Sequence, residues 1–207
     1  MKKLLVIVIS IVCLGCLNCK AVDLPPKTDH EKVKLYLFYS DSCPHCHDFI
    51  NYFLEGYRDD YKDYFEIVTY LSGTEDEKDL TDYIKANGNF ANTLGEYFGI
   101  PKIKFGFPFI VIGDYYTLGF ADGKANEIIN EALKQYQNES YEDIVEKIAK
   151  VEGEDIKEGT LYDAAKASGI KFSKDNILPD GVVIFFIVAA LVGGLGGLVY
   201  LTRKQSK

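Results

Sequence analysis

The chain has 207 residues, of which 47% are hydrophobic and 26% are charged, a composition typical of a globular protein. All 31 acidic residues but only 17 of the 23 basic residues lie between Asp23 and Asp180, so the net charge of this span is −14. Such a surface would repel nucleic acid, and we exclude that class of partner.

The first apolar segment of the chain is typical of a secretory signal peptide. Residues 1–21, MKKLLVIVISIVCLGCLNCKA, place two lysines before an apolar run that ends in small residues. Cleavage after Ala21 is one expectation. The alternatives are a lipoprotein signal in which Cys16 or Cys19 is lipidated, and an N-terminal anchor that is retained. Residues 22–31, a polar stretch with a Pro pair, follow as a linker.

The next elements are a strand and a helix with a cysteine motif between them. Residues 32–40, KVKLYLFYS, are apolar on both faces, which predicts a central strand. The motif CPHC, residues 43–46, follows almost at once. Apolar residues then recur at helical spacing and predict a helix whose buried side carries Phe49, Ile50, Phe53, Leu54 and Tyr57.

The remaining patterns complete an alternation of strands and helices. Residues 64–72 predict a second strand, and residues 74–99 a helix that is broken near NGN at 87–89. FIVI and YYTLGF predict two strands joined by a Gly-Asp turn. Residues 122–137 predict an amphipathic helix with an apolar side made of Ile128, Ile129, Ala132, Leu133 and Tyr136. The order predicts an α/β fold in which helices flank a mixed central sheet.

The C-terminal part is expected to lead into a membrane. Residues 138–180 contain two candidate short helices, packed on the domain or forming a juxtamembrane stalk. Residues 181–201, GVVIFFIVAALVGGLGGLVYL, are long and apolar enough to be a transmembrane helix; a buried core helix is the alternative. Basic residues in the tail 202–207 indicate that this tail is cytoplasmic. The middle of the chain would then be extracytoplasmic, at a cell surface, in a periplasm or in a secretory lumen.

The cysteine count narrows the chemistry of the motif. Three of the five cysteines lie in residues 1–21, so only Cys43 and Cys46 would remain in an exported domain. A zinc site needs about four ligands, and no second cysteine pair exists, so we expect no metal. A purely structural disulfide closing so short a loop would constrain the unfolded chain little. We therefore favour a redox-active pair that needs no other cofactor.

The residue types around the cysteines fit that chemistry. A cysteine reacts as the thiolate, and Cys43 is expected where a helix begins, near unpaired N–H groups and the positive end of the helix dipole. Pro44 suits the first turn because it has no N–H to leave unpaired. His45 can add a donor or a positive charge beside the sulfur. Cys43 would be the nucleophile, and Cys46, which should be less exposed, the resolving thiol.

The chain resembles the thioredoxin-like superfamily over residues 32–137, and its CPHC motif resembles that of DsbA-type disulfide-forming enzymes. The segment GFPFIVIGD matches the place of the family's cis-proline, which implies that Pro108 lies beside the cysteines and that Phe107 pairs with an extended substrate. Two features depart from the pattern. Leu37 occupies the position of a buried acid that moves protons, which leaves Asp41 or His47 as candidates for that role, although we expect His47 to be a solvated helix residue. Ser42 replaces an aromatic residue.

The resemblance implies a membrane-tethered thiol-disulfide oxidoreductase that acts on exported proteins and exchanges electrons with a membrane redox partner. The Pro-His pair and the exported location favour oxidation of clients. One alternative is a disulfide reductase or isomerase fed by a membrane electron donor. Another is a non-catalytic module that binds polypeptides in a groove near Phe107 and Phe109.

Overall fold

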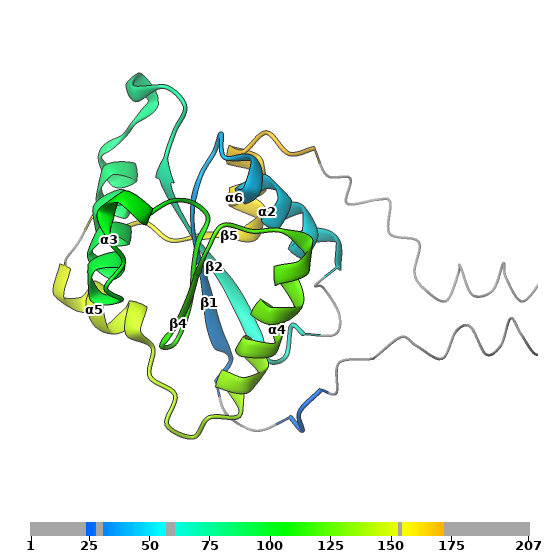
Figure 1. Cartoon of the computed structure of the whole chain (residues 1–207). Coiled ribbons are helices and arrows are strands. Elements are labelled where there is room, and N and C mark those ends of the chain that lie inside the picture. The colour runs from blue at the N-terminus through cyan, green and yellow to red at the C-terminus, as the bar shows by residue number, and fades with distance from the viewer. Residues whose placement is uncertain (1–23, 28–30, 57–60, 153–154, 172–207) are drawn as a thin grey trace, which may run out of the picture. The chain divides into compact units, whose positions relative to one another are not determined.

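The computed structural model describes residues 24–27, 31–56, 61–152 and 155–171. They form a mixed α/β domain in which helices flank both faces of a five-stranded sheet (Figure 1), as the alternation of patterns predicted. The apolar segments 1–21 and 181–201 and the tail 202–207 lie outside the described residues. Within the described residues, no helix is long and apolar enough to cross a membrane.

The strands lie in the order β4-β3-β1-β2-β5. Their bounds are β1 Val33–Ser40, β2 Phe65–Gly73, β3 Phe109–Ile112, β4 Tyr115–Leu118 and β5 Gly159–Thr160. β1 pairs in parallel with β2 and antiparallel with β3, while β4 and β5 are antiparallel to their neighbours. β1 is buried along most of its length, which confirms the prediction of a central strand.

The helices cover the two faces of the sheet unequally. Their bounds are α2 Pro44–Gly56, α3 Asp82–Tyr97, α4 Asp122–Tyr136, α5 Ile144–Glu152 and α6 Leu161–Ala167, with short 3-10 helices at Glu77–Asp79 and Lys102–Lys104. α2, α4 and α6 lie on one face, and α3 and α5 lie on the other (Figure 1). The predicted apolar side of α4 is buried at all five positions: Ile128, Ile129, Ala132, Leu133 and Tyr136.

An aromatic cluster fixes β1 on the side of α3 and α5. The ring centroid of Phe38 lies 4.8 Å from that of Tyr70, 5.7 Å from that of Phe90 and 5.6 Å from that of Phe109. All four side chains are almost fully buried, and large aromatic rings contribute much of the energy of a core. The strand that leads into CPHC is therefore held firmly by its neighbours.

The predicted break of the helix at residues 87–89 is wrong, because α3 continues through this stretch. Asn87 is fully buried, and its side-chain amide donates to the carbonyl of Leu71 over 3.0 Å. A Cβ added at Gly88 would lie only 2.9 Å from the carbonyl oxygen of Ser72. Asn and Gly usually indicate a turn, but here Asn87 and Gly88 allow α3 to pack closely against β2.

The segment after α4 packs onto the domain. α5 contacts α3, and α6 packs against α2 and β2, while β5, which no sequence pattern indicated, pairs with Val68 and Thr69. The compact unit continues to Ile170. Of the two alternatives for residues 138–180, the described part is packed on the domain.

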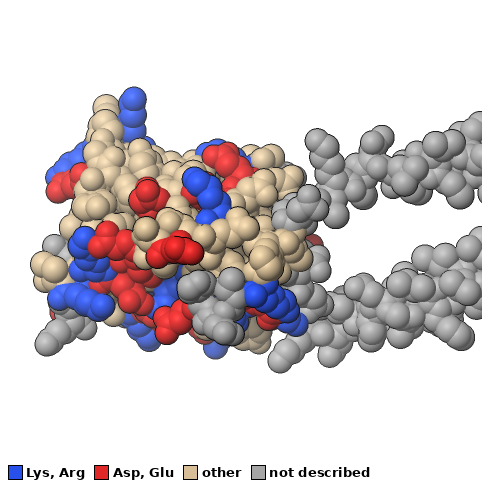
Figure 2. Space-filling view, turned by 90° about the horizontal axis from the view of Figure 1, so that it is seen from below, with Lys and Arg blue, Asp and Glu red and all other residues tan. Residues whose placement is uncertain are grey.

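A charged cluster attaches the start of α5 to β1. Lys34 forms an ion pair with Glu146. The Tyr36 hydroxyl donates to Asp143 Oδ2 over 2.7 Å, and the Glu146 N–H donates to Asp143 Oδ1 over 2.9 Å. Burial raises the pKa of Asp143, whereas the hydrogen bond from Lys34 lowers the pKa of Glu146. Figure 2 shows the domain from below, where acidic side chains gather and lysines border them.

Candidate active site

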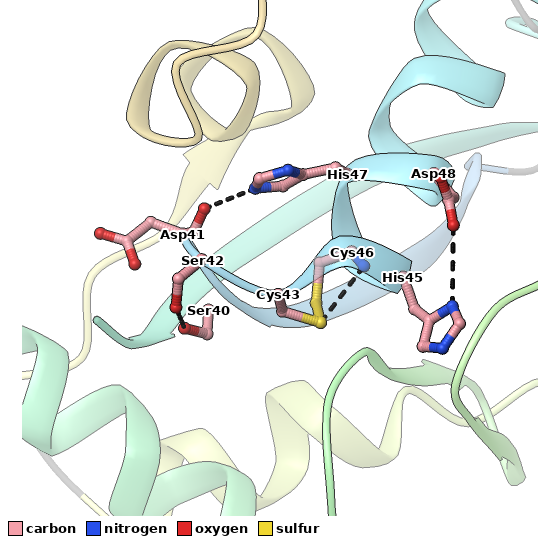
Figure 3. The surroundings of a disulfide bond; sticks show 8 residues. All are labelled: Ser40, Asp41, Ser42, Cys43, His45, Cys46, His47 and Asp48. Carbon is pink, nitrogen blue, oxygen red and sulfur yellow. Dashed lines mark hydrogen bonds and ion pairs between the residues drawn. A yellow bond between two sulfur atoms is a disulfide. The ribbon is translucent and has the colours of Figure 1, made fainter. Parts of the chain in front are cut away.

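The CPHC motif lies where β1 ends and α2 begins (Figure 3). The N–H of Cys43 donates to the carbonyl of Ser40 over 3.2 Å, and α2 starts at the next residue, Pro44. The N–H of Cys46 donates to Cys43 Sγ over 3.3 Å, so this sulfur accepts a hydrogen bond in the way a helix-capping side chain does. A thiolate at Cys43 would be stabilised by that N–H and by the helix dipole.

The two cysteines form a disulfide bond, with their Cα atoms 5.2 Å apart. Cys43 is partly exposed, while Cys46 is fully buried beneath it. This confirms the predicted difference in exposure. Cys43 is therefore the cysteine that an attacking thiolate can approach. Cys46 is positioned to be the leaving thiolate and later to reform the disulfide bond. Pro44 is the first residue of α2, as its missing N–H predicted.

His45 is exposed, and its ring turns toward Asp48 (Figure 3). Its Nδ1 lies 3.6 Å from Asp48 Oδ2, and among the described residues it makes no hydrogen bond with either sulfur. The charge of a protonated imidazole would act on Cys43 across the first turn of the helix, partly offset by the carboxylate. Asp48 was not among the predicted site residues, although its i,i+3 spacing from His45 on a helix indicates such a contact.

His47 differs from its expected role as a solvated helix residue. It is only partly exposed, and its Nε2 is hydrogen-bonded to the backbone carbonyl of Asp41. This contact ties α2 to the turn that precedes Cys43. Both Asp41 and His47 were candidates for the proton-transfer role of the buried acid that Leu37 replaces. Figure 3 shows that the Asp41 carboxylate and the His47 ring both turn away from the disulfide, so neither is placed for direct transfer.

The fold places Phe107 and Pro108 at the end of the sheet where β1 leads into the CPHC motif. Phe109 pairs with Phe38 in the antiparallel register of β3 and β1, so the residues before Phe109 lie beside the end of β1. A Cβ added at Gly73 would lie 3.4 Å from Ser40 Cβ and 3.6 Å from Phe107 Cε2. The Phe107 ring therefore lies near the end of β1, whose last residue, Ser40, precedes Cys43 by three positions.

The backbone around Phe107 keeps unused hydrogen-bonding capacity. The Phe107–Pro108 peptide bond is cis, as expected from the resemblance. The carbonyl of Pro108 accepts from the N–H of Gly119 over 2.8 Å. In contrast, the N–H and carbonyl of Phe107 bond to no other described residue. These two groups therefore remain available to pair with another extended chain.

No group of three or more His, Cys, Asp or Glu side chains in the described part of the chain could hold a metal ion. The chain matches no family model, no curated protein and no solved structure significantly. Support for the candidate site therefore comes from the geometry of the chain's own residues.

Proposed function

We propose that the chain is a protein thiol-disulfide oxidoreductase with a thioredoxin-like domain. The observation that carries the proposal is the Cys43–Cys46 disulfide at the start of α2, with Cys43 partly exposed and Cys46 buried. The order β4-β3-β1-β2, with α2 after β1 and Pro108 before β3, supports the thioredoxin-like assignment.

The proposed reaction is thiol-disulfide exchange at Cys43. A client thiolate attacks Cys43 Sγ, a bond forms between the two sulfurs, and Cys46 leaves as a thiolate. A second client thiolate then attacks the client sulfur of this mixed disulfide and releases Cys43 as a thiolate. The client gains a disulfide, and two electrons pass to the cysteine pair. A disulfide-bearing or quinone-linked membrane partner would take those electrons and reform the Cys43–Cys46 bond.

The direction that we propose is oxidation of exported proteins. The start of α2 and the N–H of Cys46 stabilise a Cys43 thiolate, and a more stable reduced form makes the pair a stronger oxidant. The proposed location is a bilayer surface, with residues 181–201 as a single span, the domain extracytoplasmic and the C-terminus cytoplasmic. No other cofactor takes part in the exchange itself.

A redox titration against glutathione tests the proposal. The Cys43–Cys46 pair in the full-length chain should equilibrate with the buffer, at a potential well above the value of about −270 mV that is typical of thioredoxin. A potential near that of thioredoxin would favour the reductase alternative. A pair that does not equilibrate at all would contradict oxidoreductase activity.

A Cys46→Ala variant separates catalysis from simple polypeptide binding. Without the resolving thiol, an enzyme accumulates mixed disulfides between Cys43 and its clients, which a non-reducing gel reveals. A non-catalytic binding module would instead retain its clients when both Cys43 and Cys46 are replaced by alanine. Loss of clients in the double variant, together with trapping in the single variant, is the result expected here.

A further inference from the structure

The first turn of α2 carries no acidic side chain. An acidic side chain there would interact favourably with the positive end of the helix dipole. Instead, this end of α2 faces the sulfur of Cys43, which accepts from the Cys46 N–H. The first carboxylate along the helix is that of Asp48, two residues after Cys46. Asp48 is therefore the acidic residue of α2 that lies closest along the helix to the reactive cysteine.

Asp48 contacts His45, and this contact accounts for the direction of the His45 ring. Nδ1 of His45 lies 3.6 Å from Oδ2 of Asp48, and the two residues have the i,i+3 spacing that brings side chains together on a helix. Among the described residues, neither side chain has another hydrogen-bonding or ionic partner. Figure 3 shows that the ring points to Asp48 rather than to the disulfide. The imidazole is thus held on the Asp48 side of the helix.

We propose that Asp48 is a positioning residue, which acts through His45 to lower the reduction potential of the Cys43–Cys46 pair. The inference rests on the proposed function and adds the control of its redox equilibrium. The carboxylate attracts the imidazole and offsets its positive charge. Without Asp48, a protonated His45 would be free to turn toward Cys43 and stabilise its thiolate. Because Asp48 leaves the thiolate less stable, the reduced pair is easier to reoxidise.

The equilibrium of the cysteine pair with glutathione tests this role. Asp48→Asn keeps the size of the side chain but removes its charge. In the full-length chain in detergent, it should shift the equilibrium about twofold toward the reduced pair, or about 9 mV at about 29.6 mV for a tenfold change. The shift is small because an exposed ion pair on a helix is weak. Both side chains are largely exposed, so the substitution should leave the fold intact.

Two further variants show whether the negative charge must lie beside His45. Asp48→Glu keeps the charge at this position and should restore the equilibrium of the parent. Glu55→Gln removes one negative charge from an exposed position near the other end of α2. This matched control should leave the equilibrium unchanged, because salt screens a charge over that distance.

Substitution of His45 distinguishes positioning from a direct effect of the Asp48 charge on Cys43. In the His45→Leu background, Asp48→Asn should shift the equilibrium much less than it does in the parent, because no imidazole is left for the carboxylate to hold. An equal shift in both backgrounds, no shift in the parent, or a shift toward the oxidised pair would overturn the role of Asp48 and leave the proposed function standing. If the parent pair does not equilibrate with glutathione at all, both proposals fail.

Discussion

The side chain of Asn87 in α3 holds the backbone of Lys157, 70 positions further along the chain. Its Nδ2 donates to the Lys157 carbonyl over 3.1 Å, and its Oδ1 accepts from the Lys157 N–H over 2.9 Å. Because the same Nδ2 also reaches Leu71 at the end of β2, one buried amide joins the helix, the sheet and the C-terminal segment.

Replacing Asn87 by alanine should destabilise the domain. The change leaves the N–H of Lys157 and the carbonyls of Lys157 and Leu71 without this partner in a partly buried place. We therefore expect the free energy of unfolding to fall by about 2 kcal/mol. Chemical denaturation measures the effect. Asn92→Ala, at an exposed position of the same helix, is the matched control and should change the stability by less than about 0.5 kcal/mol. Equal stability of the two variants would show that the Asn87 bonds contribute nothing.

Asn87 also shows why part of the fold was not predictable from local patterns. Asn and Gly favour turns when no other partner is present, and only the position of Ser72 and Lys157 in space explains why 87–89 stay helical. By contrast, a continuous apolar run was sufficient to predict β1, and helical periodicity was sufficient to predict α2 and α4. The Gly113–Asp114 turn was also predictable from the sequence, because glycine favours turns. In the structure Gly113 has a φ of 56°, a conformation that glycine tolerates.

The same distinction applies to the candidate site. The positions of Cys43, Pro44 and Cys46 followed from the strand-to-helix order, because a helix start is a local feature. The contact of His47 with Asp41 depends on how the turn folds back on the helix. The strand β5 has only two residues, Gly159 and Thr160, and no apolar run to indicate it.

The two neighbouring histidines should have separable effects. His45→Leu removes a positive charge near the start of α2, so the Cys43 thiolate loses stabilisation and the reduction potential should fall by about 30 mV. His47→Leu removes the bond to Asp41 and should instead lower the free energy of unfolding by about 1 kcal/mol, with a much smaller change in potential. Glutathione titration and chemical denaturation measure the two quantities. A larger potential change in the His47 variant would contradict this division of roles.

Reduced Cys43 should be the reactive thiol of the pair. Its sulfur accepts from the Cys46 N–H, and the residue is partly exposed, whereas Cys46 is buried. Iodoacetamide should therefore modify Cys43 faster than Cys46 and at a lower pH than it modifies a free cysteine. Mass spectrometry of the reduced full-length chain, after a short exposure at several pH values, identifies the labelled residue. A faster reaction at Cys46 would reverse the assignment of the nucleophile.

Asp143 and Asp163 should make opposite contributions to the pH dependence of stability. Burial raises the pKa of Asp143 in the folded chain, so this group's contribution to stability falls as pH rises from about 4 through its folded pKa. Hydrogen bonds from Thr160 lower the pKa of Asp163, so its contribution is present above about pH 4 and is lost as pH falls through its folded pKa.

Asparagine variants measured by denaturation between about pH 3 and 7 separate the two groups. As pH rises, the stability of the parent should decline relative to Asp143→Asn and increase relative to Asp163→Asn. Each variant serves as the control of the other. Two trends of the same sign would contradict the assigned directions.

The pairing of β3 with β1 also determines when the proposed site can be completed. During synthesis both cysteines emerge long before Phe107 and Pro108, because α3 and the residues around it are translated between them. A growing chain that ends after α3 carries both cysteines without the segment of Phe107 and Pro108 that leads into β3. The newly made protein can therefore bring a client past its disulfide in the proposed way only after β3 has left the ribosome and joined the sheet.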